Sequence, residues 1–208
     1  MSPRAPRAPA GDAPVVLFRT ARQWTTWLDR NANSPGVWMR IAKRDAAIRS
    51  ITYAEAVEVA LCHGWIDSQK RAHDADTFLQ KFTPRGPRSV WSRVNRDKAQ
   101  ALIAGGRMRP AGLRAVEQAR ASGRWDSAYE PQGRAAVPAD LRQALARNPK
   151  ARAFFETLTG ANRYAVLFRI QTAMRPETRA RRVERFVAML ARGETLHPSR
   201  KGAGRRAV

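Results

Sequence analysis

Short helices with clearly marked starts are the feature that most constrains how this chain folds. Thr20 and Thr52 each stand three residues before a Gln or a Glu, the spacing at which two side chains cap the first turn of a helix. Pro110, Pro138 and the Asn148-Pro149 pair are typical first-turn residues and indicate three further starts. The chain therefore predicts a domain built from several short helices.

Behind these starts, apolar residues recur at the three- and four-residue spacing of one helix face. Gly64 follows the helix that begins at Thr52, where a C-terminal cap belongs. The residues expected to face the core are Trp24, Trp27 and Leu28, then Tyr53, Val57, Ala60 and Leu61, then Leu113, Val116 and Ala119, and in the last helices Leu141, Leu145, Phe155, Val183, Phe186 and Leu190.

Three segments have the alternating pattern of β-strands. Residues 37–43 place Val37, Met39 and Ile41 on one face, and residues 65–70 and 77–82 form a second and third strand around the polar loop 72–76. The segment 83–89 is rich in proline and glycine and is expected to be irregular. The predicted fold is α+β, with a small antiparallel sheet of about three strands covered by several helices and a helical C-terminal half.

The domain organisation follows from where large apolar residues occur. Residues 1–14 and 197–208 contain too few to bury, so we expect a disordered arm and a disordered basic tail. Residues 15–196 are expected to form a single domain, and the linker at 126–137 leaves a sub-boundary open. The N-terminus lacks the apolar stretch of a secretory signal and no apolar run has the length of a membrane span, so the expected location is the cytoplasm.

The net charge is unusually high. The 208 residues contain 39 Lys and Arg against 17 Asp and Glu, a formal charge of +22, and most of the excess lies within residues 15–196. Such a surface attracts polyanions, including nucleic acid and anionic lipid headgroups. A generally high isoelectric point without a functional meaning is the alternative reading.

The densest group of unusual side chains lies between Gly64 and Asn95. It predicts a binding surface on the hairpin and its exit loop, made of Trp65, Asp67, Arg85, Arg88, Ser89, Trp91, Ser92 and Asn95. Strand alternation would make Trp65 and Asp67 near neighbours on one face. Each residue also has a structural reading: the tryptophans as core, Ser92 and Asn95 as helix caps, and Asp67 as the partner of Arg85 or Arg88 in an ion pair.

Several motifs in this region resemble one known family. The runs ALCHGWIDSQKR, FTPR with S-x-W-S-x-x-N, GGRMRPAGLRAVEQARASGRW and ETRARRV are similar to the YdeI/OmpD-associated proteins, over about residues 15–195. The family is linked by name to bacteriocin protection. The resemblance implies no reaction, no cofactor and no catalytic residue.

Catalytic and metal-binding signatures are weak. His73, Asp74 and Asp76 could ligate a metal, although a solvated hairpin tip explains them better, and no metal site or cofactor is expected. Cys62 and His63 are adjacent in a helix and point about 100° apart, so they do not form a nucleophile–base pair. Whether the protein is an enzyme stays undecided, and the balance of residues favours a protein that is not one.

Two functions stay in view. The first is a cytoplasmic basic interaction protein with a protein or anionic partner, linked through the resemblance to tolerance of bacteriocins or cationic envelope-directed toxins. The alternative is sequence-unspecific nucleic-acid binding, because residues 81–124 carry eleven basic and two acidic side chains and residues 175–208 carry ten and three. Arg175, Arg179 and Arg182 are spaced to form a polyanion-binding ridge on one helix. An enzyme of unknown reaction class is the second alternative.

Overall fold

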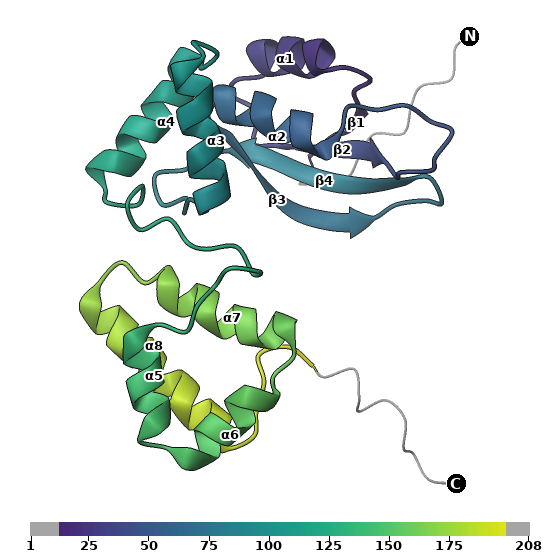
Figure 1. Cartoon of the computed structure of the whole chain (residues 1–208). Coiled ribbons are helices and arrows are strands. Elements are labelled where there is room, and N and C mark those ends of the chain that lie inside the picture. Colours follow the sequence, from purple (N-terminus) through teal and green to yellow (C-terminus); the bar gives the residue numbers. More distant parts are fainter. Residues whose placement is uncertain (1–12, 199–208) are drawn as a thin grey trace, which may run out of the picture. The chain divides into compact units, whose positions relative to one another are not determined.

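The computed structural model describes residues 13–198, and its fold is α+β as predicted (Figure 1). The described part contains four strands and eight helices. In chain order these are β1 (Val15–Leu17), α1 (Ala21–Arg30), β2 (Val37–Ala42), α2 (Tyr53–Cys62), β3 (Trp65–Ala72), β4 (Thr77–Pro84), α3 (Arg93–Ala104), α4 (Pro110–Ala121), α5 (Ala139–Ala146), α6 (Pro149–Thr157), α7 (Gly160–Gln171) and α8 (Pro176–Ala191). None of these helices has the length and apolar character needed to cross a bilayer.

The sheet corrects the prediction of three antiparallel strands. It is a mixed sheet of four strands in the order β1-β2-β4-β3, in which β1 runs parallel to β2 and the other pairs are antiparallel. A parallel pair needs a crossover connection, and α1 supplies it. Strand β1 follows a proline-rich segment and has only three residues. A strand of this length is too short to be recognised from an alternating pattern.

The hairpin of β3 and β4 is longer than expected. Thr83 and Pro84 continue β4 to pair with Ile66 and Trp65, so the irregular segment begins only after Pro84. Proline is tolerated there because at Pro84 the strand pairs with β3 alone, beyond the last pairing of β2 with Phe82. The register shifts between Asp67 and Lys70, which interrupts the simple alternation predicted for β3.

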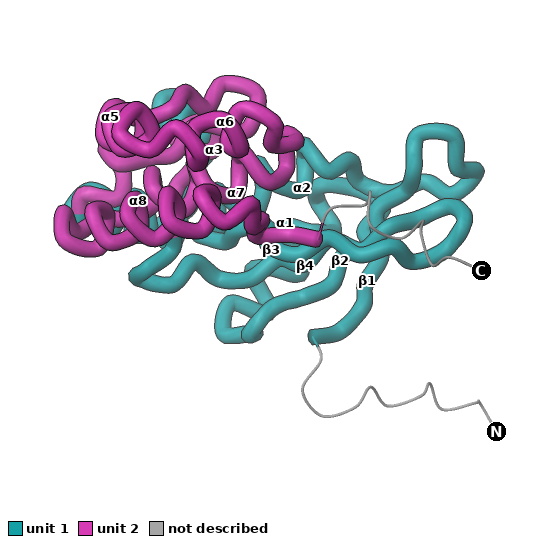
Figure 2. Tube along the Cα trace, turned by 90° about the horizontal axis from the view of Figure 1, so that it is seen from below, with its two compact units in different colours: residues 1–89, 97–122 teal, residues 90–96, 123–208 magenta. Residues whose placement is uncertain are grey.

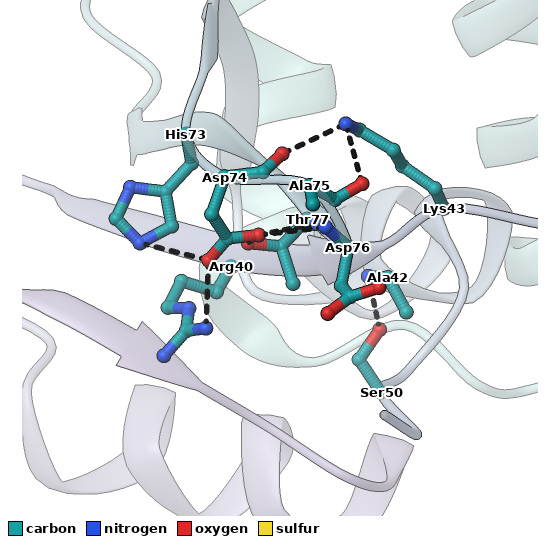
Figure 3. A network of polar contacts seen from close by, with 9 residues as sticks. All are labelled: Arg40, Ala42, Lys43, Ser50, His73, Asp74, Ala75, Asp76 and Thr77. Carbon is teal, nitrogen blue, oxygen red and sulfur yellow. Dashed lines mark hydrogen bonds and ion pairs between the residues drawn. The ribbon is translucent and has the colours of Figure 1, made fainter. Parts of the chain in front are cut away.

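The tip of this hairpin is organised by Asp74 (Figure 3). Its Oδ1 accepts hydrogen bonds from the backbone N–H groups of Asp76 and Thr77 and from the Thr77 hydroxyl, and its Oδ2 accepts one from Arg40 at 3.1 Å. Lys43 donates to the backbone carbonyls of Asp74 and Ala75. The hydrogen bond from the Thr77 hydroxyl, followed by those from the backbone N–H groups of Thr77 and Asp76, holds the pKa of Asp74 below its ordinary value.

The two predicted capping boxes differ in detail. The box at Thr52 is complete, since Thr52 Oγ1 accepts from the N–H of Glu55 and the Glu55 carboxylate accepts from the N–H of Thr52. At the start of α1, Thr20 Oγ1 accepts from the N–H of Gln23, but the Gln23 side chain accepts from Arg19 instead. Helices α1 and α2 lie on the same side of the sheet (Figure 1).

An aromatic cluster fills the space between these helices and the sheet. Trp24 is fully buried and lies 5.6 Å from Phe82 and 6.1 Å from Trp65, measured between ring centroids. Val37, Met39 and Ile41 of β2 are buried as predicted, and Trp38 on the opposite face of β2 is buried too, with the Arg71 guanidinium 4.3 Å from its ring.

Two residues of the predicted helix stripes face solvent instead. Tyr53 is 44% exposed and Leu113 is 38% exposed. The Tyr53 hydroxyl donates to Asp67 Oδ2 at 2.7 Å, so a polar contact turns this first-turn residue outward. On α4, Gly112 is buried in place of its neighbour Leu113, because the helix packs on the backbone of α2 at this point.

The described residues divide into two compact units (Figure 2). Unit 1 contains the sheet, α1, α2, α4 and most of α3, and unit 2 contains residues 90–96 and the chain from Gly123 onward. Unit 2 has a core of its own, formed by Leu141, Leu145, Ala151, Phe155, Val166, Leu167, Ile170, Val183, Phe186 and Leu190. The expectation of a single domain over residues 15–196 stays a prediction.

The predicted disordered ends lie almost wholly outside the described residues, which exclude 1–12 and 199–208. Their innermost residues are bonded to the fold. The carbonyl of Pro14 accepts a hydrogen bond from Trp38, and the backbone of His197 makes two with the Asn162 side chain. The predicted limits at 14 and 197 therefore fall on residues that are held at the backbone.

Candidate binding cleft

A cleft of about 1010 Å³ opens in unit 1. It lies between the end of α1, the junction of α2 with β3, the end of β4 and the first three turns of α4. Its volume is at the upper end of the range typical of small-molecule sites. Four separate segments of the chain converge here, which makes this cleft a candidate site.

Two glycines allow the walls of this cleft to approach each other. Gly64 has φ +72°, and a Cβ there would meet the carbonyl oxygen of Ala111 at 2.7 Å. A Cβ on Gly112 would meet the carbonyl oxygen of Cys62 at 2.3 Å. The N–H of Arg109 donates to the same Cys62 carbonyl. The start of α4 is therefore fixed against the end of α2 through backbone atoms.

His63 and Asp29 form a polar pair on the wall of the cleft. His63 Nε2 lies 3.1 Å from Asp29 Oδ1, and its Nδ1 lies 2.9 Å from the carbonyl oxygen of Val59. Both partners are acceptors, so a ring that carries protons on both nitrogens satisfies both contacts, whereas a neutral ring satisfies only one. Both ring nitrogens of His63 therefore face acceptors of the protein itself.

The charge of the cleft is positive. It is lined by Arg85, which follows β4, by Arg109, the N-cap residue of α4, and by Arg114 of α4. The carboxylates that line it are Asp29 and Glu117. Asp29 is already paired with His63. Helix α4 adds to the positive potential, because it begins with Pro110, has no acidic residue in its first turn and receives no side-chain cap from Arg109.

The predicted binding surface is divided between the two units. Unit 1 holds Trp65, Asp67, Arg85, Arg88 and Ser89, and unit 2 holds Trp91, Ser92 and Asn95. Of the eight, Trp65 and Arg85 line the cleft.

The other members of the predicted surface make local contacts. Ser92 Oγ accepts from the N–H of Asn95 at the start of α3, and Ser89 Oγ accepts from the N–H of Gly86. Trp91 is 2% exposed and packs on Trp125, with ring centroids 4.9 Å apart. Arg88 is exposed. These contacts match the structural interpretations of the sequence, in which Ser92 caps a helix and Trp91 belongs to the core.

Two of the three arginines in the predicted ridge are held by partners within unit 2. Arg179 forms a bidentate ion pair with Asp140, in which Nε lies 2.6 Å from Oδ2 and Nη2 lies 3.0 Å from Oδ1. Arg179 also donates to the carbonyl of Ile170. Arg182 donates to the carbonyl of Arg169. Arg175 is the exposed N-cap residue of α8.

The described residues contain no group of three or more His, Cys, Asp or Glu side chains placed to hold a metal ion. Asp74, considered above as a ligand with His73 and Asp76, is engaged in the hairpin turn (Figure 3). Cys62 is buried beside the cleft, and burial raises the pKa of its thiol, which keeps it protonated and unreactive.

Sequence reasoning missed four residues of the cleft: Asp29, His63, Arg109 and Arg114. They come from three helices or helix ends that are far apart along the chain. The available signals were the glycines of the HGW and RPAG segments, because a glycine within a predicted helix often marks a close approach of two backbones.

Two family models match separate parts of the chain. Residues 16–115 match a family described as a domain of unknown function (DUF8412), and residues 134–193 match the family described as Bacteriocin-protection, YdeI or OmpD-Associated. The second match covers α5 to α8 and the ETRARRV motif. Of the other motifs quoted for the resemblance, two lie within the first match and the one that begins at Gly105 extends beyond its end at residue 115. No curated protein and no solved structure matches the chain significantly. The resemblance to the YdeI/OmpD-associated family that the sequence indicated is therefore confirmed, by the match at residues 134–193.

Proposed function

We propose that this protein is a cytoplasmic, basic interaction protein that binds its ligand in the cleft of unit 1 and thereby contributes to tolerance of bacteriocins or cationic envelope-directed toxins. The observation that carries the binding part is the cleft itself, with its volume of about 1010 Å³ and its convergent charged side chains. The link to toxin tolerance is supported by the description of the family that residues 134–193 match.

The side chains of the cleft favour binding over catalysis. A general base needs a nitrogen or oxygen free to accept a proton, and both ring nitrogens of His63 already face acceptors. The nearby Cys62 thiol is buried and has a raised pKa, the opposite of an activated nucleophile. Arginines, in contrast, bind anions without undergoing a reaction.

The internal contacts of unit 2 favour this proposal over nucleic-acid binding. A guanidinium group that contacts phosphate must be exposed, and Arg179 would have to leave Asp140 to do so. The overall positive charge still promotes loose binding of polyanions, so measurements are best made at about 150 mM salt, where screening is strong.

Blocking the cleft tests the proposal in cells. Ala115 lines the cleft from α4, and Ala115→Trp would fill part of it. Ala101 is exposed on α3 in the same unit, so Ala101→Trp adds an equal side chain outside the cleft. A strain lacking the gene is complemented with each variant, and survival is scored against a panel of bacteriocins and cationic peptides. Circular dichroism and thermal unfolding establish that both variants fold.

We expect the wild type and Ala101→Trp to restore survival and Ala115→Trp to fail. Full complementation by a folded Ala115→Trp variant would show that toxin tolerance does not depend on the cleft. Equal survival with and without the gene would remove the link to toxins altogether.

A further inference from the structure

We propose that the cleft of unit 1 binds an amphipathic anion: a phosphate or carboxylate group held by arginines, joined to a small apolar ring or chain. This inference rests on the proposed function and adds the chemical class of the ligand. The charges of the cleft, its apolar wall and its construction support it.

The charged group follows from the balance of side chains. Three arginines line the cleft against two carboxylates, and one of these, Asp29, already faces His63 Nε2 at 3.1 Å. Arg109, the N-cap residue of α4, and Arg114 of α4 are both exposed, so their guanidinium groups are available to a ligand that enters from solvent. Guanidinium groups bind phosphate and carboxylate through two parallel hydrogen bonds, which makes an anion the favoured occupant.

The apolar part follows from the rest of the wall. Pro84 and Pro110 are exposed apolar residues of the cleft wall. Leu28 and Trp65 also line the cleft, with 2% and 3% of their surfaces exposed, and Trp65 is held by edge-on contacts with Trp24 and Trp27. A pocket built only for an inorganic ion has no need of such a surface, because small ions are held by polar groups alone. Rigid apolar walls beside a few charged groups are typical of sites for small organic ligands.

The construction of the cleft fixes its two sides against each other at one end. Its two sides are joined at one end by the contacts of Gly64 and Gly112 with backbone atoms, which leave no room for a side chain between α2 and α4. A site held by backbone contacts is preorganised, so little ordering of the protein opposes binding.

The experiment uses the full chain and four probes: phenyl phosphate, benzoate, inorganic phosphate and benzyl alcohol. Affinities are measured by calorimetry at about 150 mM salt, and the site is located from chemical shift changes of backbone amides. One double variant, Arg109→Gln with Arg114→Gln, removes two charges from the cleft. A matched variant, Arg44→Gln with Arg49→Gln, removes two exposed charges of the same unit outside it.

We expect phenyl phosphate or benzoate to bind about tenfold more tightly than inorganic phosphate and benzyl alcohol, because only these two probes combine a charge with an apolar ring. The tighter binder of the two shows whether the cleft prefers a phosphate or a carboxylate group. The cleft variant should weaken binding about tenfold or more, since hydrogen bonds to a charged group are lost, and the matched variant should change it less than about twofold.

Three results would overturn the inference. Equal affinity for benzyl alcohol would mean that the cleft binds apolar molecules without a charge requirement, and the proposed function would stand. An equal loss of probe affinity in the two double variants would mean that the general positive charge of the protein attracts the probes. Absence of shift changes at the cleft with all four probes would reject the ligand class, and the survival assay with Ala115→Trp would then decide the proposed function alone.

Discussion

Thr52 and Glu55 illustrate how much a pair of side chains accomplishes within one helical turn. The Glu55 carboxylate accepts hydrogen bonds from both the N–H and the hydroxyl of Thr52, at 2.9 and 2.7 Å. These bonds hold the pKa of Glu55 below its ordinary value. The pair satisfies donors that would otherwise lack partners at the start of α2, the helix whose other end forms the wall of the cleft.

Thr52→Ala should lower the free energy of unfolding by roughly 0.5–2 kcal/mol, because the N–H of Glu55 loses its capping acceptor. Thr52→Ser keeps the hydroxyl and serves as the control. Urea titration of both variants measures the difference. An unchanged midpoint in Thr52→Ala would show that this cap contributes nothing to stability.

Asp140 should make unit 2 sensitive to acid. The hydrogen bonds from Arg179, followed by the backbone N–H of Leu141, hold the pKa of Asp140 below its ordinary value. A lowered folded pKa means that the stabilisation is fully present above the unfolded value of about 3.9 and is lost as the pH falls through the folded pKa.

The variant Asp140→Asn should therefore be less stable than the wild type at pH 7, and the difference should shrink below about pH 4. Glu184→Gln, at an exposed position of α8, is the control for the loss of a carboxylate. Chemical denaturation across this pH range provides the measurement. A difference between wild type and Asp140→Asn that does not vary with pH would contradict the assignment.

At the scale of elements, the packing of α4 on α2 is the decisive contact of unit 1. Gly112 is the third residue of α4, where alanine would ordinarily favour the helix by about 1 kcal/mol. The added Cβ would lie 2.3 Å from the carbonyl oxygen of Cys62 and 2.8 Å from that of Leu61, both of them backbone atoms that cannot move aside alone. The clash therefore outweighs the gain in helix propensity.

Gly112→Ala should destabilise the protein by about 1–3 kcal/mol, the usual cost of overpacking. It should also weaken probe binding, because α4 must shift and carries Arg109 and Arg114 with it. Gly86→Ala, where nothing lies within 4 Å of the added Cβ, is the matched control. A midpoint of thermal unfolding for Gly112→Ala that is equal to or higher than that of the wild type would refute the close contact.

At the scale of the whole molecule, unit 2 has the means to fold without the sheet. Its core residues all lie between Leu141 and Leu190. The preceding segment adds the Tyr129–Phe168 ring contact at 4.8 Å and a hydrogen bond from the N–H of Glu130 to Gln171. Residues 123–198 together have about the size at which a helical domain can be stable alone.

A fragment of residues 123–198 should therefore be helical and unfold cooperatively, with a lower midpoint than the full chain because Trp125 loses Trp91. Circular dichroism and calorimetry of the fragment and of the full chain measure this. Phe186→Ala, which opens a cavity in the core, should abolish the transition of the fragment. A fragment without a cooperative transition would support the expectation of one domain over residues 15–196.

The sequence by itself determined the features that depend on neighbours within one or two turns. The cap at Thr52, the Asn148 cap whose side chain accepts from Ala151, and the buried stripe of β2 are all local patterns, and each is present in the structure. Local hydrogen bonds and amphipathic periodicity act within a few residues, so they can be read without knowing the fold.

Only the tertiary structure decided the features that join distant segments. The parallel pairing of β1, the outward turn of Tyr53 towards Asp67 and the ion pair of Arg179 with Asp140 each link elements separated by many residues. The cleft is the extreme case: Trp65 and Arg85 were singled out from one stretch of sequence, but Asp29, Arg109 and Arg114 reach them only through folding. Long-range contacts depend on how whole elements pack, and no spacing along the chain encodes that packing directly.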